Sequence, residues 1–135
     1  MICATIYPAH AKERGLYDAI VIGAGPTGSH VAAELARRGR RVAVLEQQDS
    51  IGKKGCCTGI VGRECVEKFP VARQAVAREA SGARFFSPSR ASFTLRKDSA
   101  QAYILDRQAF DEAMASNAQA LGAEYLLSTK VKGID

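Results

Sequence analysis

Blocks of apolar and polar positions near the start of the chain predict a strand, a helix and a second strand. Residues 19–22 form a short apolar run rich in β-branched side chains, which is typical of a buried parallel strand. From Pro26 to about Arg38 small apolar residues recur at helical spacing, and Gly39 stands where a left-handed residue commonly ends a helix. Residues 42–45 form a second apolar run. The stretch therefore predicts a βαβ unit with a right-handed crossover.

The pattern then changes to shorter elements. Apolar positions in residues 61–80 predict two short helices, separated by Pro70. Farther along, apolar and polar residues alternate, which predicts a hairpin of residues 83–86 and 91–95 around a turn, and a third strand at 102–105. An antiparallel ribbon placed here would interrupt the parallel α/β pattern.

The helical period returns near the end of the chain. Apolar residues at three- and four-residue spacing predict a helix over 107–121, with Asp106 as its N-cap and Gly122 at its end. A strand is predicted at 124–127, and the apolar positions of 131–135 predict a further strand or an extension of that one. The fold class that follows is α/β, a Rossmann-like fold whose parallel sheet is interrupted by an antiparallel β segment.

A G-x-G-x-x-G run joins the first strand to the first helix. Its first glycine allows a tight turn, its second leaves room for a pyrophosphate, and its third permits close contact between helix and strand. A proline after the second glycine suits the first helical turn, whose N–H groups meet phosphates with favourable dipole sign. The residues are Gly23, Gly25, Pro26, Thr27 and Gly28.

Glu46 ends the second strand and follows Gly23 by 23 residues, close to the spacing of the acid that binds an adenosine ribose. Strand, helix and acid together favour a dinucleotide site over a Rossmann-like unit without a ligand. The acid argues against a 2′-phosphate and so against NADP, but it leaves NAD and FAD open. A Walker-type phosphate loop is excluded, because no Gly-Lys-Ser/Thr follows.

The composition narrows the class of protein. At 135 residues and a net charge of +5, with no tryptophan and scattered basic residues, the chain shows no nucleic-acid footprint. No apolar run approaches a membrane span, no secretory signal is visible, and four cysteines without a C-x-x-C pair suit a reducing cytoplasm. The two histidines have no ligand-spaced neighbours, so no metal site is predicted.

Several segments, taken together, resemble FAD-dependent oxidoreductases of the geranylgeranyl reductase family. The resemblance runs in order through residues 17–135: the Gly-Ala-Gly-Pro-Thr-Gly run, Val-Leu-Glu, Ile51-Gly52, Cys57-Thr58-Gly59-Ile60, Leu105 to Asp111, and Leu121 to Glu124. The Cys-Thr-Gly-Ile segment and the Arg-x-x-Phe-Asp segment are more particular to the family than the glycine run, which many flavoproteins share.

The resemblance implies FAD as the cofactor and reduced FAD as the reductant of isoprenoid double bonds in prenyl lipids or chlorophyll precursors. It implies that Thr27 and its flanking glycines meet the pyrophosphate, and that Glu46 takes the adenosine ribose. It also implies that Cys57, Thr58 and Ile60 lie beside the flavin, that Arg107 reaches the cofactor, and that the Val131 backbone borders the adenine. NAD(P)H or reduced ferredoxin is the implied electron donor, and a prenyl lipid substrate leaves peripheral membrane contact open.

Members of that family are much longer than this chain, so the resemblance predicts an N-terminal fragment, inactive by itself, of a larger reductase. The expected organisation is a leader (1–16), a first part of the FAD-binding domain (17–80), a β segment of the substrate domain (81–106) and a second part of the FAD-binding domain (107–135). No catalytic residue can be assigned. A related flavin-dependent monooxygenase or halogenase, or a non-catalytic dinucleotide-binding module, are the alternatives.

Overall fold

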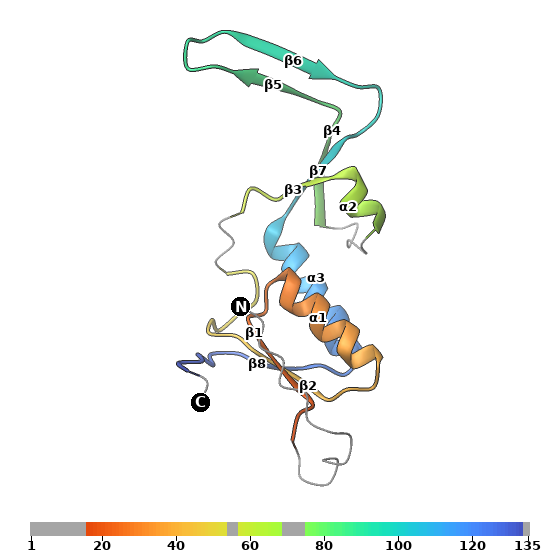
Figure 1. Cartoon of the computed structure of the whole chain (residues 1–135), viewed down its shortest axis with the longest axis vertical. Helices are drawn as coiled ribbons and strands as arrows, with labels where there is room; N and C mark the ends of the chain where they lie inside the picture. Colours follow the sequence, from red (N-terminus) through yellow and green to blue (C-terminus); the bar gives the residue numbers. More distant parts are fainter. Residues whose placement is uncertain (1–15, 54–56, 69–74, 134–135) are drawn as a thin grey trace.

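The computed structural model describes residues 16–53, 57–68 and 75–133. Strands β1 (Ala19–Ile22), β2 (Val42–Leu45) and β8 (Glu124–Leu126) pair in parallel in the order β1-β2-β8. Helices α1 (Pro26–Arg37) and α3 (Arg107–Ala120) lie side by side on one face of this sheet (Figure 1). The predicted α/β fold with a parallel sheet is confirmed.

The core between sheet and helices is built from small side chains. Val42 and Val44 point toward the helices, and Ala32, Ala36 and Ala118 are buried against the sheet. Alanine on its inner face lets α1 approach β1 and β2 closely, while α3 packs mainly on α1. The predicted close helix–strand contact follows from this composition.

The opposite face of the parallel sheet is open along its edges. Ile20 is 47% exposed, Ile22 is 46% exposed, and Leu126 on the other edge strand is also exposed, while Ala43 of the central strand β2 is buried. The expectation of a strand buried on both faces is therefore wrong for β1, because among the described residues only α1 and α3 pack on the sheet, both on one side (Figure 1).

The residues that the sequence predicts as caps lie at the ends of both long helices. α1 stops where Gly39 takes a φ of +74°, and the Gly39 and Arg40 N–H groups donate to the last free carbonyls of the helix. At the start of α3, the Asp106 carboxylate accepts from the Ala109 N–H at 3.1 Å, and Gly122 with a φ of +101° follows its last turn.

A second sheet is antiparallel and has the order β3-β7-β4. It contains β3 (Ile60–Gly62), β7 (Ala102–Leu105) and β4 (Val76–Ala80), with the short helix α2 (Arg63–Lys68) following β3. Of the two helices predicted over 61–80, the first is confirmed as α2. The second is wrong for 76–80, where pairing with β7 imposes a strand; the preceding 71–74 lie outside the described residues.

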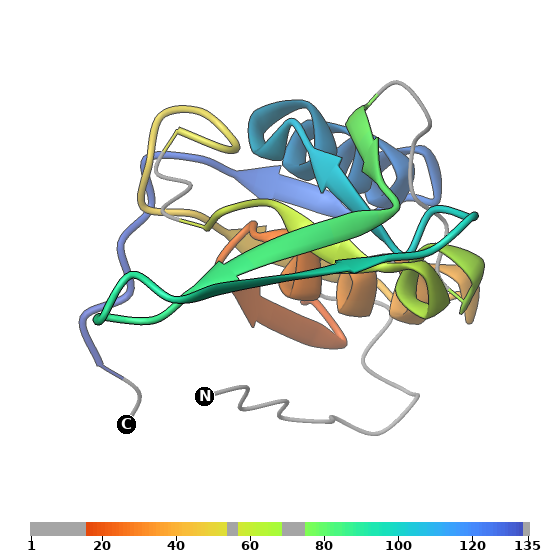
Figure 2. The same cartoon turned by 90° about the horizontal axis from the view of Figure 1, so that it is seen from above.

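The predicted hairpin is confirmed as β5 (Gly82–Phe86) and β6 (Ser92–Arg96), in a register that pairs Phe85 with Phe93. These two rings stack with centroids 4.8 Å apart. The hairpin lies at the far end of the long axis from the parallel sheet, with the second sheet between them (Figure 1), and from above it crosses the molecule (Figure 2). The predicted strand at 102–105 exists as β7, but it joins β3 and β4 instead of the hairpin.

The remaining predictions concern the last strand, the leader and the domain boundaries. Residues 131–133 form no strand, so the strand predicted to begin at Val131 is wrong there; 134–135 lie outside the described residues, as does the leader up to residue 15. The domain limits stay a prediction, although antiparallel pairing starts at Ile60 and not at residue 81. No helix in the described part of the chain is long and apolar enough to cross a membrane.

Candidate functional site

The three glycines of the turn between β1 and α1 differ in conformation and surroundings. Gly23 has a φ of +99°, a left-handed conformation that turns the chain off the strand. A Cβ on Gly28 would meet the Gly23 carbonyl oxygen at 2.1 Å, so the helix packs directly on the turn. A Cβ on Gly25 would meet nothing within 4 Å, because Gly25 faces open space. Thr27 is exposed in the first turn of α1.

Glu46, at the carboxyl end of β2, is held against this turn. Its Oε2 accepts from the Ala24 N–H at 2.9 Å, and its Oε1 accepts from the Gln48 N–H at 2.8 Å. The backbone of Glu46 is fixed too, since its N–H donates to the Leu126 carbonyl at 3.0 Å. The predicted ribose-binding acid is thus also the residue that ties the glycine turn to the following loop.

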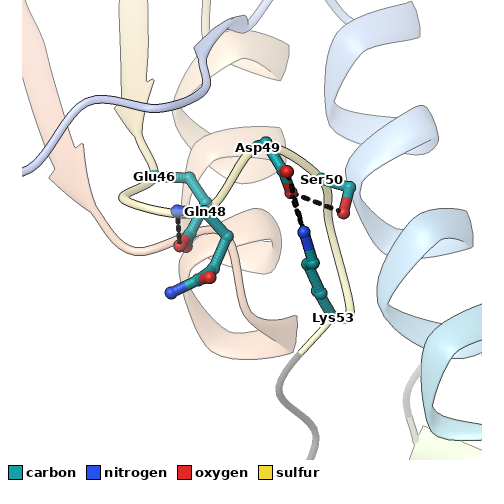
Figure 3. Close-up of polar contacts among 5 residues, drawn as sticks. All are labelled: Glu46, Gln48, Asp49, Ser50 and Lys53. Atoms are coloured by element: carbon teal, nitrogen blue, oxygen red, sulfur yellow. Dashed lines mark hydrogen bonds and ion pairs between the residues drawn. The ribbon is translucent and has the colours of Figure 1, made fainter.

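The loop after Glu46 curls back on itself (Figure 3). Lys53 Nζ lies 2.7 Å from both carboxylate oxygens of Asp49, and the Ser50 hydroxyl donates to the same carboxylate at 3.2 Å. The Lys53 hydrogen bonds hold the pKa of Asp49 below its usual value. Gly52, with a φ of +78°, brings the loop against Gln108 of α3.

A chain of two hydrogen bonds connects the glycine turn to strand β8. Tyr125 of β8 donates its hydroxyl to Ser29 Oγ at 2.9 Å, and Ser29, fully buried in α1, donates to the Ala24 carbonyl at 3.3 Å. Burial raises the pKa of Tyr125, and the hydrogen bond to Ser29 offsets only part of that effect. The chain connects β8 to the glycine turn.

Arg107, the first residue of α3, lies between a carboxylate and a thiol. Its Nη2 donates to Asp111 Oδ1 at 2.9 Å, and Asp111 is buried. The Gly59 backbone N–H, with a further contribution from the Arg107 guanidinium, lowers the pKa of the exposed Cys57 thiol. Burial raises the pKa of Asp111, and Arg107 offsets this in part. The pKa of Arg107 itself is raised, since its two acidic neighbours outweigh its burial.

These groups meet in one cleft of about 290 Å³. Five residues predicted for the cofactor line it: Gly25, Pro26, Glu46, Cys57 and Arg107. Gly23, Thr27 and Gly28 belong to the same turn as Gly25 but do not line the cleft. Thr58 and Ile60, which are exposed, and Val131, which is half-buried, are also absent from its described lining.

The cleft also contains residues that sequence reasoning did not assign to the site. They are Ala24, Gln47, Gln48, Ser50, Gly52, Lys53 and Asp111. The polar loop directly after Glu46 was a usable signal for most of them, since backbone after the acid-bearing strand must pass the ligand. Asp111 could have been found from its four-residue spacing to Arg107 on a predicted helix.

The arrangement fits a dinucleotide. Gly25 leaves open space at the N-terminus of α1, Glu46 stands beside it, and the buried Nε of Arg107 has no hydrogen-bond partner among the described residues. The helix N-terminus and the guanidinium both favour a negatively charged ligand.

A family model agrees with this geometry. The model for FAD dependent oxidoreductases matches residues 18–96. The chain belongs to the FAD dependent oxidoreductase family. The match begins just before β1 and extends to the end of β6, so it includes the glycine turn, Glu46 and Cys57.

Curated proteins are similar in sequence to this chain over most of its length. It is 32% identical over 122 residues to a digeranylgeranylglycerophospholipid reductase of Methanosarcina mazei, covering 87% of this chain and 30% of that protein. A reductase of the same name from Methanosphaera stadtmanae is 35% identical over 122 residues, with the same coverage of both chains. The chain thus spans about 30% of the length of these relatives.

Solved structures of other proteins have a similar fold. A geranylgeranyl bacteriochlorophyll reductase-like protein from Thermoplasma acidophilum superposes with a TM-score of 0.75 at 27% identity, covering 87% of this chain and 32% of that one. A flavin-dependent brominase superposes with a TM-score of 0.63 at 22% identity, covering 82% of this chain and 29% of that one, a likeness that concerns the fold alone.

Proposed function

We propose that this chain forms the FAD-binding part of an oxidoreductase that saturates carbon–carbon double bonds of prenyl lipids. The observation that carries the proposal is the single cleft in which Gly25, Glu46, Cys57 and Arg107 meet. The named reductases among the relatives support the substrate class, because they match this chain over its β1–α1–β2 unit and its α3 segment alike.

The glycine turn and Glu46 would hold the adenosine diphosphate half of FAD. Backbone N–H groups in the first turn of α1, from Thr27 onward because Pro26 has none, suit the pyrophosphate. Both Glu46 oxygens already accept one backbone N–H each, but a carboxylate oxygen has two acceptor positions. Glu46 can therefore keep the turn in place and still accept hydrogen bonds from ribose hydroxyls.

The other wall of the cleft would hold the rest of the cofactor. Arg107 supplies positive charge there, and Cys57 is the adjacent exposed group, followed in the chain by Thr58 and Ile60. Val131 is proposed for the adenine side through its backbone. When bound and reduced, FAD supplies the hydride for hydrogenation of the double bond.

The remaining features of the reaction belong to the same proposal. NAD(P)H or reduced ferredoxin would reduce the flavin, and the protein would act in the cytoplasm with peripheral contact to the membrane that contains its lipid substrate. The phospholipid in the name of these related reductases supports a lipid substrate.

FAD titration of the whole chain, followed by quenching of flavin fluorescence, tests the cofactor. Saturable quenching is expected, and Glu46→Gln should raise the Kd at least about tenfold, because the charged acceptor of turn and ribose is lost. Glu34→Gln is the matched control, since Glu34 pairs with Arg38 on the outer side of α1. Absence of quenching by the wild-type chain would refute the cofactor assignment.

The activity is tested on the longest product of the gene that carries this chain. Reduced flavin in that product should be reoxidised by a geranylgeranyl lipid and should yield the saturated lipid by mass spectrometry. Stimulation of NAD(P)H oxidation by a phenol, without lipid reduction, would favour the hydroxylase alternative instead.

A further inference from the structure

Asp111 is a buried carboxylate in the wall of the cleft. It lies in the second turn of α3, is 5% exposed, and lines the same space as Gly25 and Glu46. Burying a carboxylate is costly unless it is paired and hydrogen-bonded. A buried acid beside a site for an anionic ligand therefore requires an explanation.

The partner of Asp111 is Arg107, one helical turn earlier. Nη2 of Arg107 lies 2.9 Å from Oδ1 and 3.3 Å from Oδ2, so one nitrogen serves both carboxylate oxygens. Four-residue spacing on one helix fixes the two side chains relative to each other. The pair therefore holds one edge of the guanidinium in a fixed position.

The rest of the guanidinium is engaged only in part, by the Cys57 thiol and by the Phe110 ring, whose centroid lies 5.9 Å from Cζ. The Arg107 Nε is buried and has no hydrogen-bond partner among the described residues, although Arg107 lines the cleft. A buried donor without an acceptor is destabilising, and it is the kind of group that a ligand oxygen satisfies.

We propose that Asp111 is a positioning residue, which fixes Arg107 by Nη2 so that its remaining nitrogen atoms donate to an oxygen of the bound dinucleotide. The inference rests on the proposed function, because it assumes a dinucleotide in the cleft. The acceptor oxygen belongs either to the pyrophosphate or to the flavin half.

If Asp111 acted only through its charge, neutralising it would strengthen FAD binding, because a carboxylate repels an anionic ligand. Positioning predicts weaker binding, since a released guanidinium loses its orientation. The direction of the change in FAD affinity therefore decides between the two.

The experiment titrates FAD into the whole chain carrying Asp111→Asn, with Glu112→Gln as the matched control. Glu112 is the next residue, is exposed, and accepts from Gln108 with the same four-residue spacing. Asp111→Asn should raise the Kd for FAD about tenfold, a coupling of the size found between contacting residues. Glu112→Gln should leave the Kd unchanged.

A mutant cycle with Arg107→Met separates positioning from a general loss of structure. If Asp111 acts through Arg107, Asp111→Asn should weaken FAD binding little further in the Arg107→Met background. Asp111→Glu keeps the charge but moves it by one methylene, so it should lose part of the affinity; it also serves if Asp111→Asn does not fold. Circular dichroism confirms the fold of each variant before titration.

Repeating the binding measurements with ADP, which lacks the flavin half, shows which part of FAD carries the acceptor oxygen. A similar loss of affinity for both ligands in Asp111→Asn places the acceptor on the pyrophosphate. A loss of affinity for FAD alone places it on the flavin half.

If the wild-type chain binds FAD and Asp111→Asn binds it as tightly or more tightly, the positioning role is overturned while the proposed function stands. Additive effects in the cycle would overturn it as well. If the wild-type chain binds no FAD, the proposed function itself fails.

Discussion

Gly25 and Gly28 are three residues apart in one turn, yet their missing side chains serve different ends. At Gly28 a Cβ would collide with the Gly23 carbonyl oxygen, which is rigid backbone. At Gly25 a Cβ would enter open space in the cleft. Gly28 is therefore needed for the fold, whereas the proposed function has Gly25 leaving room for the ligand.

Substituting alanine at each position should separate these roles. Gly28→Ala should destabilise the chain by about 3 kcal/mol in urea unfolding, because the turn must open to admit the methyl group. Gly25→Ala should cost less than about 1 kcal/mol, since this extended N-cap position accepts a side chain. It should nevertheless weaken FAD binding at least about tenfold. Unchanged FAD affinity in Gly25→Ala would contradict the placement of the pyrophosphate there.

The Cys57 thiol offers a second residue-scale test. Its pKa is lowered, first by the Gly59 backbone N–H and then by Arg107. Iodoacetamide should therefore modify Cys57 at half its maximal rate below a pH of about 8.5, the value of an ordinary thiol. Arg107→Met should shift this midpoint upward, but only in part, because the Gly59 N–H stays. Peptide mass spectrometry measures the rate, with exposed Cys65 as the reference thiol; a midpoint unmoved by Arg107→Met would exclude the guanidinium's contribution.

At the scale of elements, Ser29 and Tyr125 connect α1, the glycine turn and β8. The Ser29 hydroxyl lies between the Ala24 carbonyl and the Tyr125 hydroxyl, and none of its surface is exposed. A side-chain network of this kind is costly when half of it is removed. Strand β8 lies about 100 residues after the glycine turn in the sequence. The Tyr125–Ser29 hydrogen bond is therefore a long-range contact that holds the turn in place.

Removing one hydroxyl at a time should show this dependence. Ser29→Ala should destabilise the chain by about 2 kcal/mol, because it leaves the Tyr125 hydroxyl without its acceptor. Tyr125→Phe should cost only about 1 kcal/mol. The double variant should be more stable than the sum of the two losses predicts. Urea unfolding measures each; strictly additive losses would argue against a connected network.

The same tyrosine predicts a pH dependence with a definite sign. Its folded-state pKa is raised above the unfolded value of about 10, mainly by burial. The protonated hydroxyl therefore contributes stability that is complete below pH 10 and is lost as the pH rises toward the folded-state value. Between pH 9 and 11 the wild type should lose more unfolding free energy than Tyr125→Phe. Parallel curves would contradict this.

The elements that could be predicted from the sequence are those with local signals. α1 and α3 have helical spacing, and Gly39, Asp106 and Gly122 mark their ends. The strand at Val76–Ala80 could not be predicted, because its state depends on pairing with β7, some 25 residues away in the chain. In the site, the glycines and Glu46 had a known spacing, and the four-residue spacing of Arg107 and Asp111 was a local signal for their pairing. The burial of Asp111 depends on packing between distant segments, which no local pattern reveals.

At the scale of the whole molecule, the described helices that pack on the parallel sheet, α1 and α3, both lie on one face of it. Val21 of β1 points toward α1 and is 4% exposed, while its neighbours Ile20 and Ile22 point the other way and are about half exposed. Leu126 extends this open face onto β8. Between these two edge strands, Ala43 of β2 is buried and Leu45 is half-buried, so the exposed apolar side chains lie along the two edges of this face. Exposed apolar side chains are available to bind apolar ligands or other protein surfaces.

The two faces of β1 should respond differently to the same kind of substitution. Val21→Ala removes buried methyl groups from the core and should cost about 2 kcal/mol in urea unfolding. Ile20→Thr with Ile22→Thr should cost less than about 1 kcal/mol, because threonine keeps the β-branched shape and these positions are already in contact with water. The double variant should also bind less of the fluorescent probe ANS than the wild type, and should remain monomeric to higher concentration in sedimentation. If instead it unfolds as readily as Val21→Ala, the second face of the sheet is covered in solution, and Ile20 and Ile22 contribute to a core of their own.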